Sequence, residues 1–286
     1  MVIGSKTHTM SQAKRSLDTP SKVSKTEVKI SEAEYADFRL QADRVKEDGL
    51  VPLIVSSGSA QADSKALTKA CRRFDGVSDF QQLKIINGLG VQVESRQLKK
   101  FLQQLPVGSH VHVDRNLEPS PATIFQEASA PISSPTETSA QRLKGLDQVW
   151  QQGYRGQGQT IAVIDSGIFP HADLKEHVAA WVDFCDEKPR MVDPLGHGTH
   201  VAGIIVGDGS KSEGQIKGVA PEAQIAALRI GSVKDAIEAL DWVVANREKY
   251  HINVVNLSMG DKATKNFKED PFAQAVQKAI DNGLVV

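Results

Sequence analysis

Ile161–Gly167 (IAVIDSG) and His197–Gly203 (HGTHVAG) are the two stretches of sequence on which the predicted fold depends. The first is a short apolar run that ends in a carboxylate and a glycine turn, which is typical of a buried parallel strand with its functional group at the carboxyl end. The second places a histidine at the start of a helix of small residues. Asp165 followed by His197 supplies the first two members of an Asp–His–Ser relay.

Composition sets the class of protein. The chain has 286 residues, of which 40% are hydrophobic and 24% charged, as in an ordinary globular protein of one large or two smaller domains. A net charge of −1 argues against nucleic-acid or anionic-membrane partners. No apolar run is long enough to span a bilayer. The polar segment 1–11 lacks a secretory signal, so the protein stays inside, starts further upstream or is exported unconventionally; the compartment is left open.

The two cysteines predict neither a disulfide scaffold nor a zinc site. Cys71 continues an apolar helix face and is predicted to be a buried, inert thiol. Cys185 lies in a loop-like stretch and is predicted to be a free thiol.

The amino-terminal part divides into a polar extension, residues 1–48, and a small domain, residues 49–115. The extension has a basic tail and a short helix that opens at a capping box, Ser31–Glu34. In the small domain, hydrophobic periodicity predicts strands at 50–56, 82–86, 91–94 and 110–114, and helices at 64–74 and 98–105. The order βαββαβ predicts an α+β domain of the ferredoxin-like kind.

A linker rich in Pro, Ser, Thr and Glu is predicted at 116–142, before a second domain at 143–286. Apolar strands are predicted at 160–164, 225–229, 252–257 and 284–286. Ser232 and Asp270 are each predicted to cap the start of a helix that lies between two of these strands. Strands of this kind, alternating with helices, predict an α/β fold: a doubly wound parallel sheet covered on both faces, incomplete within this chain.

Each candidate site residue also has a plainer interpretation. Asp165 could simply cap the turn after its strand. His197 lies between two glycines, which would leave the imidazole in a cleft as a general base. His197 and His200 could instead share a metal, but no further ligands with suitable spacing accompany them. His200 by itself is better explained as a packed structural histidine.

Together these motifs resemble the amino-terminal part of a subtilisin-like serine protease, a member of the subtilase family. The matching segments are 161–168, 197–207, 218–223 and 255–260. Upstream, Lys84–Gly88 and Val111–Asp114 resemble the inhibitory propeptide of secreted subtilases. The resemblance implies that 49–115 assists folding, binds in the cleft as the protein's own inhibitor, and is cleaved off between Arg115 and Gln126.

The resemblance also implies roles for individual residues. Asp165 would orient the base, His197 would be the base, and Ser258, Met259 and Gly260 would pair with an extended polypeptide substrate, although the Met259 side chain could equally be core packing. No cofactor is implied for the chemistry. A structural calcium ion is implied only through Asp173, because the loop 207–215 does not match the companion loop of that site.

The family's Gly-Asn motif, which supplies the oxyanion-hole asparagine, and its Gly-Thr-Ser motif, which supplies the nucleophile, do not occur in these 286 residues. The sequence therefore predicts a serine endopeptidase precursor whose present chain is an inactive fragment ending before the serine motif. Two alternatives remain open: an inhibitory or binding module that acts through its propeptide, and a pseudoenzyme whose sheet is a scaffold.

Overall fold

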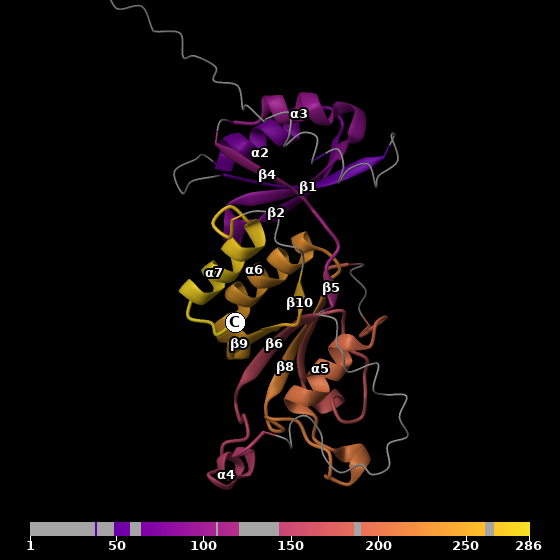
Figure 1. The fold of residues 1–286 in the computed structure, drawn as a ribbon, viewed down its shortest axis with the longest axis vertical. Helices are drawn as coiled ribbons and strands as arrows, with labels where there is room; N and C mark the ends of the chain where they lie inside the picture. Colours follow the sequence, from indigo (N-terminus) through magenta and orange to yellow (C-terminus); the bar gives the residue numbers. More distant parts are fainter. Residues whose placement is uncertain are drawn as a thin grey trace, which may run out of the picture.

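The computed structural model describes residues 38, 49–57, 64–106, 108–119, 143–185, 190–260 and 266–286. Phe38 lies in a helix, whereas the rest of the predicted tail and capping-box helix falls outside the described residues. The described chain forms two units, each built on a sheet, and helices α6 and α7 lie between the two sheets (Figure 1).

The first unit is a four-stranded antiparallel sheet with two helices on one face. The sheet order is β2-β3-β1-β4, and the element order is the predicted βαββαβ. The elements are β1 (Leu50–Ser57), α2 (Ser64–Arg73), β2 (Val77–Leu83), η1 (Lys84–Ile86), β3 (Gly88–Glu94), η2 (Ser95–Gln97), α3 (Leu98–Gln104) and β4 (Ser109–Val113).

Strand β1 is buried on both of its faces, and this links the two units. Leu53 and Val55 pack with the helices α2 and α3, whereas Ile54 between them belongs to the core that surrounds α6 (Val233–Tyr250). Alternation along a strand sends successive side chains to opposite faces. The sheet therefore uses one face for its own core and the other to dock on the second unit.

The predicted strand 82–86 is wrong in its second half. Strand β2 ends at Leu83 and residues 84–86 form a 3-10 turn, which Asn87 closes in the left-handed conformation at φ 51°. Gly88, which lies between the predicted strands 82–86 and 91–94, is the first residue of β3. A Cβ there would come 2.8 Å from the carbonyl oxygen of Val55, so glycine permits the close pairing of β3 with β1.

The second unit is a parallel sheet of order β7-β8-β6-β9, which confirms the predicted parallel α/β arrangement. Its elements are α4 (Leu146–Gln151), β6 (Thr160–Asp165), η4 (Lys175–His177), β7 (Val178–Asp183), α5 (His197–Val206), η5 (Ser210–Ser212), β8 (Gln224–Arg229), α6 (Val233–Tyr250), β9 (Ile252–Leu257) and α7 (Pro271–Asp281). The short strands β5 (Glu118–Pro119) and β10 (Met259–Gly260) form a separate antiparallel pair.

Both faces of the parallel sheet are covered, as predicted. Ile161 and Val163 of β6 pack with α5, whereas Ala162 and Ile164 pack with α6 and α7. The predicted helix starts are present: Ser232 and Asp235 form a capping box, and Asp270 caps α7 with Pro271 in its first turn. The predicted strand 284–286 is reduced to one parallel bridge between Val285 and Val254, and β7 had not been predicted.

Candidate active site

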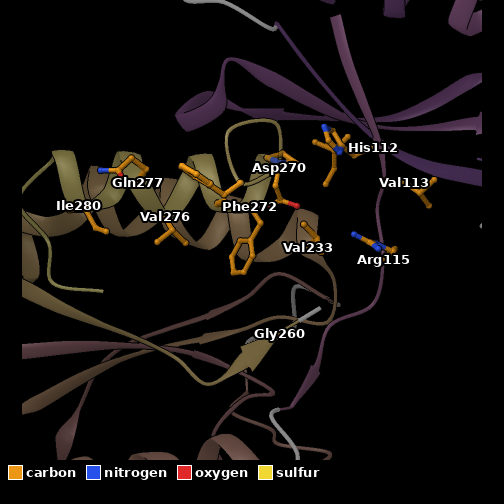
Figure 2. Close-up of a pocket in the computed structure, with 14 residues that line it drawn as sticks. His112, Val113, Arg115, Val233, Gly260, Asp270, Phe272, Val276, Gln277 and Ile280 are labelled. Carbon is orange, nitrogen blue, oxygen red and sulfur yellow. Dashed lines mark hydrogen bonds between the residues drawn. The ribbon is translucent and has the colours of Figure 1, made fainter. Parts of the chain in front are cut away.

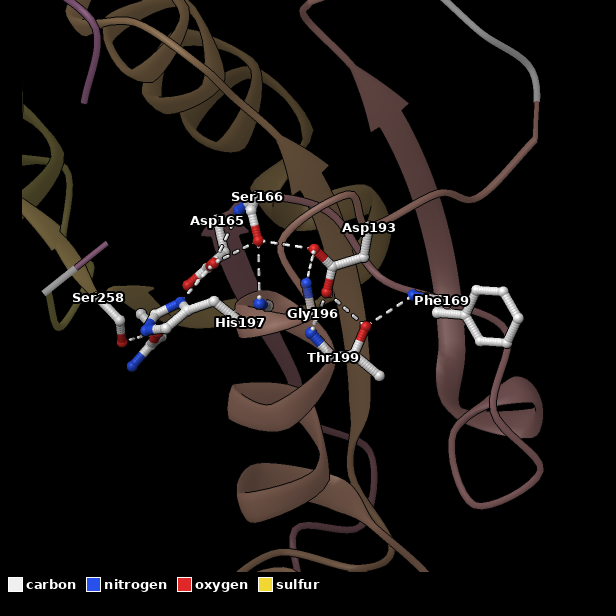
Figure 3. Close-up of polar contacts among 10 residues, drawn as sticks. Asp165, Ser166, Phe169, Asp193, Gly196, His197, Thr199 and Ser258 are labelled. Atoms are coloured by element: carbon white, nitrogen blue, oxygen red, sulfur yellow. Dashed lines mark hydrogen bonds and ion pairs between the residues drawn. The ribbon is translucent and has the colours of Figure 1, made fainter. Parts of the chain in front are cut away.

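Asp165 and His197 meet at the carboxyl end of the central strand β6. Asp165 is the last residue of β6 and His197 is the first residue of α5. The Nδ1 atom of His197 lies 2.7 Å from Oδ1 of Asp165, and the two residues are 7% and 1% exposed (Figure 3). The two sequence-predicted catalytic residues therefore form a buried, directly hydrogen-bonded pair.

Two glycines make this close approach possible. A Cβ on Gly198 would lie 2.0 Å from the carbonyl oxygen of Gly167 and 3.1 Å from Cβ of Asp165. Gly167 has φ +119°, a conformation that other residues rarely adopt, and a Cβ there would lie 2.0 Å from the carbonyl oxygen of Val192. The glycines after the carboxylate and after the histidine thus bring the start of α5 onto the end of β6.

The carboxylate assigns roles to the two imidazole nitrogens. Oδ1 of Asp165 also accepts the backbone N–H of Ser166 at 2.7 Å, while its Oδ2 is buried and has no hydrogen-bond partner among the described residues. An ionised carboxylate can only accept, so it favours the tautomer of His197 with the proton on Nδ1. Nε2 is then left as the basic nitrogen, which is the arrangement a general base requires.

Sequence reasoning missed a second carboxylate beside the pair. The Asp193 carboxylate accepts the backbone N–H of Gly196 at 3.0 Å and of Thr199 at 2.8 Å, and the hydroxyl of Ser166 at 2.7 Å (Figure 3). An aspartate shortly before a helix start is the sequence signal that could have found it, because such residues satisfy the free N–H groups of the first turn.

His200 has a different environment from His197. It lies on α5 three residues further on and is exposed, so the prediction of a packed structural histidine is wrong. A helix exposes one face while it buries another, and position 200 falls on the exposed side. Within the described ranges no group of three or more His, Cys, Asp or Glu side chains could hold a metal ion.

The oxygen atoms around Asp173 do not form a metal site among the residues that the structure describes. Its Oδ1 already accepts the backbone N–H of Lys211 at 2.8 Å. Asp208, in the facing loop, accepts the N–H and hydroxyl of Ser210 at 2.8 and 2.6 Å. Calcium needs six to eight oxygen ligands, and here the nearby carboxylates are engaged with protein donors.

Ser258, Met259 and Gly260 lie where β9 runs into β10. The Ser258 hydroxyl donates to Oδ1 of Asn256 at 2.8 Å, and the Met259 side chain is 8% exposed within the core around α6. The backbone of β10 pairs with β5, so that Met259 faces Pro119 and Gly260 faces Glu118.

The segment 116–119 is held on its other side as well. Asn116 forms an antiparallel bridge with Ser232, and the N–H of Leu117 donates to the carbonyl of Gly231 at 2.9 Å. Leu117 is 6% exposed. Part of the predicted linker is therefore an extended strand bound between two segments of the second unit.

Neither Cys71 nor Cys185 forms a disulfide in the structure. Cys71 is buried in the first unit, where burial raises the pKa of its thiol to about 11. Cys185 is exposed just after the end of β7. These environments confirm that Cys71 is buried and that neither cysteine is in a disulfide, whereas the inertness of Cys71 stays a prediction.

Comparison with known proteins identifies the second unit. Residues 156–286 match the model of the Subtilase family (Peptidase_S8), so this part of the chain is similar to the domains of that family. Among curated relatives, Serine protease AprX of Bacillus subtilis (strain 168) is 35% identical over 146 residues, which cover 47% of this chain and 33% of that protein. Minor extracellular protease Epr of the same organism is 32% identical over 215 residues, covering 72% and 31%.

Other relatives extend the match upstream. The alkaline protease of Shouchella clausii is 31% identical over 262 residues, covering 83% of this chain and 64% of that protein. The chain thus spans between 31% and 64% of the length of these three relatives.

Among solved structures, fervidolysin from Fervidobacterium pennivorans, a keratinolytic enzyme related to subtilisin, aligns with a TM-score of 0.55 and 20% identity over 82% of this chain and 39% of its own. This likeness confirms the subtilisin-like α/β fold. The ferredoxin-like assignment of the first unit stays a prediction. In the described ranges, no helix has the length and apolar character needed to cross a membrane.

Proposed function

We propose that this chain is part of a serine endopeptidase of the subtilase family, synthesised as an autoinhibited precursor. The observation that carries the proposal is the placement of Leu117. The N–H of Ile230 donates to the carbonyl of Asp165 at 2.9 Å, and the next residue, Gly231, receives the N–H of Leu117. The extended segment 116–119 is therefore bound at Gly231, the residue directly after Ile230, whose backbone contacts Asp165.

The proposed reaction uses the pair as orienter and base. Nε2 of His197 takes the proton of a serine hydroxyl supplied from outside these residues, and the serine oxygen attacks a peptide carbonyl. The protonated His197 then gives its proton to the leaving amine, and water hydrolyses the acyl-enzyme. Asp165 accepts the hydrogen bond from Nδ1–H of His197 at each step and stabilises the imidazolium when it forms.

The proposed substrate is an extended polypeptide. Backbone groups of residues 231–232 and 259–260 pair with the segment 116–119, as they would with a substrate strand. Pairing through the backbone is tolerant of sequence, which supports broad specificity. No nucleic acid is proposed as a partner, because the chain has a net charge of −1.

The first unit is the proposed inhibitor, with boundaries 49–115, a linker at 116–142 and the catalytic part at 143–286. The sheet face of this unit that is not covered by α2 and α3 contacts α6 through polar groups and through Ile54. Oδ1 of Asp114 accepts the N–H of Lys234 at 2.8 Å, and the Gln81 side chain donates to Glu238. These contacts anchor the sheet at the start of α6 and at its second turn.

A pocket of about 430 Å³ remains at this junction (Figure 2). It is lined by Ile54 and His112 of the first unit, by Phe272 and Val276 of α7, and by Gly260 of β10. The two units therefore meet with a gap next to the proposed substrate strand. Such incomplete packing suits an inhibitor that must later leave.

The alternative of a pseudoenzyme scaffold is disfavoured by the buried pair. A scaffold has no need for a buried carboxylate bonded to a histidine, since burying charged groups costs free energy. The alternative of a separate inhibitory module shares the Leu117 contact and differs only in lacking its own catalysis.

Autoinhibition can be tested in the precursor expressed from its complete coding sequence. Leu117→Asp would place a charge in a buried site and expel the segment. Labelling by a serine-directed fluorophosphonate probe should become faster in Leu117→Asp, whereas Arg72→Ala, an exposed change on α2, should label like the unchanged precursor. Equal labelling rates in Leu117→Asp and the unchanged precursor would refute autoinhibition by this segment. No labelling of any form would favour a pseudoenzyme or an inhibitory module.

A further inference from the structure

Asp193 lies at the centre of a hydrogen-bond cluster whose donors come from both sides of the candidate site. Its Oδ1 accepts the N–H of Gly196 and the hydroxyl of Ser166, and its Oδ2 accepts the N–H and, at 2.5 Å, the hydroxyl of Thr199. The carboxylate thus joins the start of α5 to the turn after β6. Nothing in the proposed reaction uses it directly.

The Ser166 hydroxyl lies between two carboxylates and has one proton to give. Its Oγ is 2.7 Å from Oδ1 of Asp193 and 3.2 Å from Oδ1 of Asp165. The same oxygen accepts the N–H of Gly198 at 3.1 Å. Because a hydroxyl donates once, the shorter distance assigns the proton to Asp193.

This assignment has a consequence for Asp165. Its Oδ1 already accepts the N–H of Ser166 and faces Nδ1 of His197, each at 2.7 Å. A further hydroxyl proton on the same oxygen would share its negative charge and weaken the bond to the imidazole.

We propose that Asp193 is a positioning residue that acts through Ser166: it holds the Ser166 hydroxyl proton away from Asp165, so that this carboxylate remains available to the His197 N–H. The proposal rests on the proposed function for its catalytic meaning. Its structural part, the direction of one hydroxyl, can be tested without any activity.

The first test uses the 286-residue chain and the NMR resonance of the His197 Nδ1 proton. In Asp193→Asn, an amide N–H faces Ser166, and the Ser166 hydroxyl turns to donate to Asp165. The Nδ1 resonance should then move upfield, because the hydrogen bond from His197 to Asp165 weakens. Ser166→Ala should leave the resonance in place, because the removed hydroxyl was not bonded to Asp165. The double variant should return it to the unchanged position.

Thr199→Val is the matched control. It removes another hydroxyl from Asp193 and disturbs the same helix start, but it does not touch Ser166. The resonance should therefore stay where it is. A purely structural role for Asp193 predicts instead that Thr199→Val and Asp193→Asn both move it.

Two results would overturn the proposal. One is an upfield shift in Asp193→Asn that persists in the double variant, because the effect would then not pass through Ser166. The other is a downfield shift in Ser166→Ala alone, because the hydroxyl would then have been bonded to Asp165. The second result needs only Ser166→Ala, so the proposal stays testable if Asp193→Asn does not fold.

The kinetic test separates this proposal from the proposed function. In the active protein, Asp193→Asn should lower kcat by roughly tenfold with KM unchanged, as expected when one charge-assisted hydrogen bond is redistributed. Adding Ser166→Ala to Asp193→Asn should restore most of the lost kcat. If the wild-type protein has no activity but the variants show the predicted NMR pattern, only the proposed function is refuted. Activity in Asp193→Asn equal to the unchanged protein would refute the catalytic meaning of this positioning role.

Discussion

Replacing Gly198 by alanine should break the contact between α5 and β6 on which the candidate site depends. The new Cβ would start 2.0 Å from the carbonyl oxygen of Gly167 and 3.1 Å from Cβ of Asp165. Neither obstacle is the flexible end of a side chain: the first is backbone, and the second is fixed at the end of a buried strand. The start of the helix must therefore move away by at least about 1 Å, because real Cβ atoms essentially never approach another heavy atom to less than 3.0 Å.

That movement has a calculable effect on the Asp165–His197 hydrogen bond. Its 2.7 Å length would grow toward about 3.7 Å, beyond hydrogen-bond range. Forcing an extra methyl group into packed structure costs about 1–3 kcal/mol. With Tm falling by about 2–4 °C per kcal/mol in a domain of this size, Gly198→Ala should lower Tm by several degrees. A displacement of 1 Å at a catalytic group also costs roughly 100-fold in rate.

Gly203→Ala provides the matched control, because it makes the same change in the same helix. A Cβ at that position meets nothing within 4 Å. Alanine is favoured over glycine inside a helix by roughly 0.5–1 kcal/mol, so this variant should gain a few degrees in Tm. Calorimetry of both variants, with NMR of the His197 Nδ1 proton, measures the two effects. A Gly198→Ala protein as stable as the Gly203→Ala protein, with its Nδ1 resonance unmoved, would refute the reasoning.

Three further predictions concern the docked unit, a helix start and the thiols. Burial raises the pKa of Asp114 to about 6 in the docked state from its ordinary value of 3.8. Docking therefore favours the protonated carboxyl, and the affinity between the two cleaved units should fall by roughly tenfold as pH rises from 5 to 7.5. Calorimetric titration of one cleaved unit with the other measures this affinity, which should not depend on pH in this way in Asp114→Asn. Ser232→Ala removes the side-chain acceptor of the α6 capping box and should cost about 1 kcal/mol in chemical denaturation, and a loss near zero would contradict the assigned cap. In the native protein a thiol reagent should modify Cys185 quickly and Cys71 only after unfolding, and two fast equivalents would contradict the buried environment of Cys71.

The parallel fold was predictable because local pattern and burial agree along the central strands. Residues 161–164 are apolar without interruption, and the structure buries them on both faces of the sheet. Strand β7 was missed because its residues are only partly covered at the edge of the sheet, which leaves a weaker apolar signal. The end of β2 was misplaced because Asn87 sets a left-handed turn that periodicity alone does not reveal.

The candidate pair was predictable from chain order and glycine spacing, but its surroundings were not. Asp193 and Ser166 meet only through the packing of α5 on β6, and no periodic pattern connects them. Likewise, composition predicted a loose linker from 116 onward. Residues 116–119 instead have backbone partners at Ser232 and β10. Pairing with distant backbone is a tertiary effect that local composition does not contain.

The most direct test of the central claim is the rate of peptide hydrolysis in the protein expressed from its complete coding sequence, compared between His197→Ala and His200→Ala. The control removes a histidine three residues away on the exposed side of the same helix. We expect His200→Ala to keep its activity and His197→Ala to lose about 10⁶-fold in kcat, which is the loss known for the catalytic histidine of subtilisin. Undiminished hydrolysis in His197→Ala would contradict the assignment of this histidine as the general base.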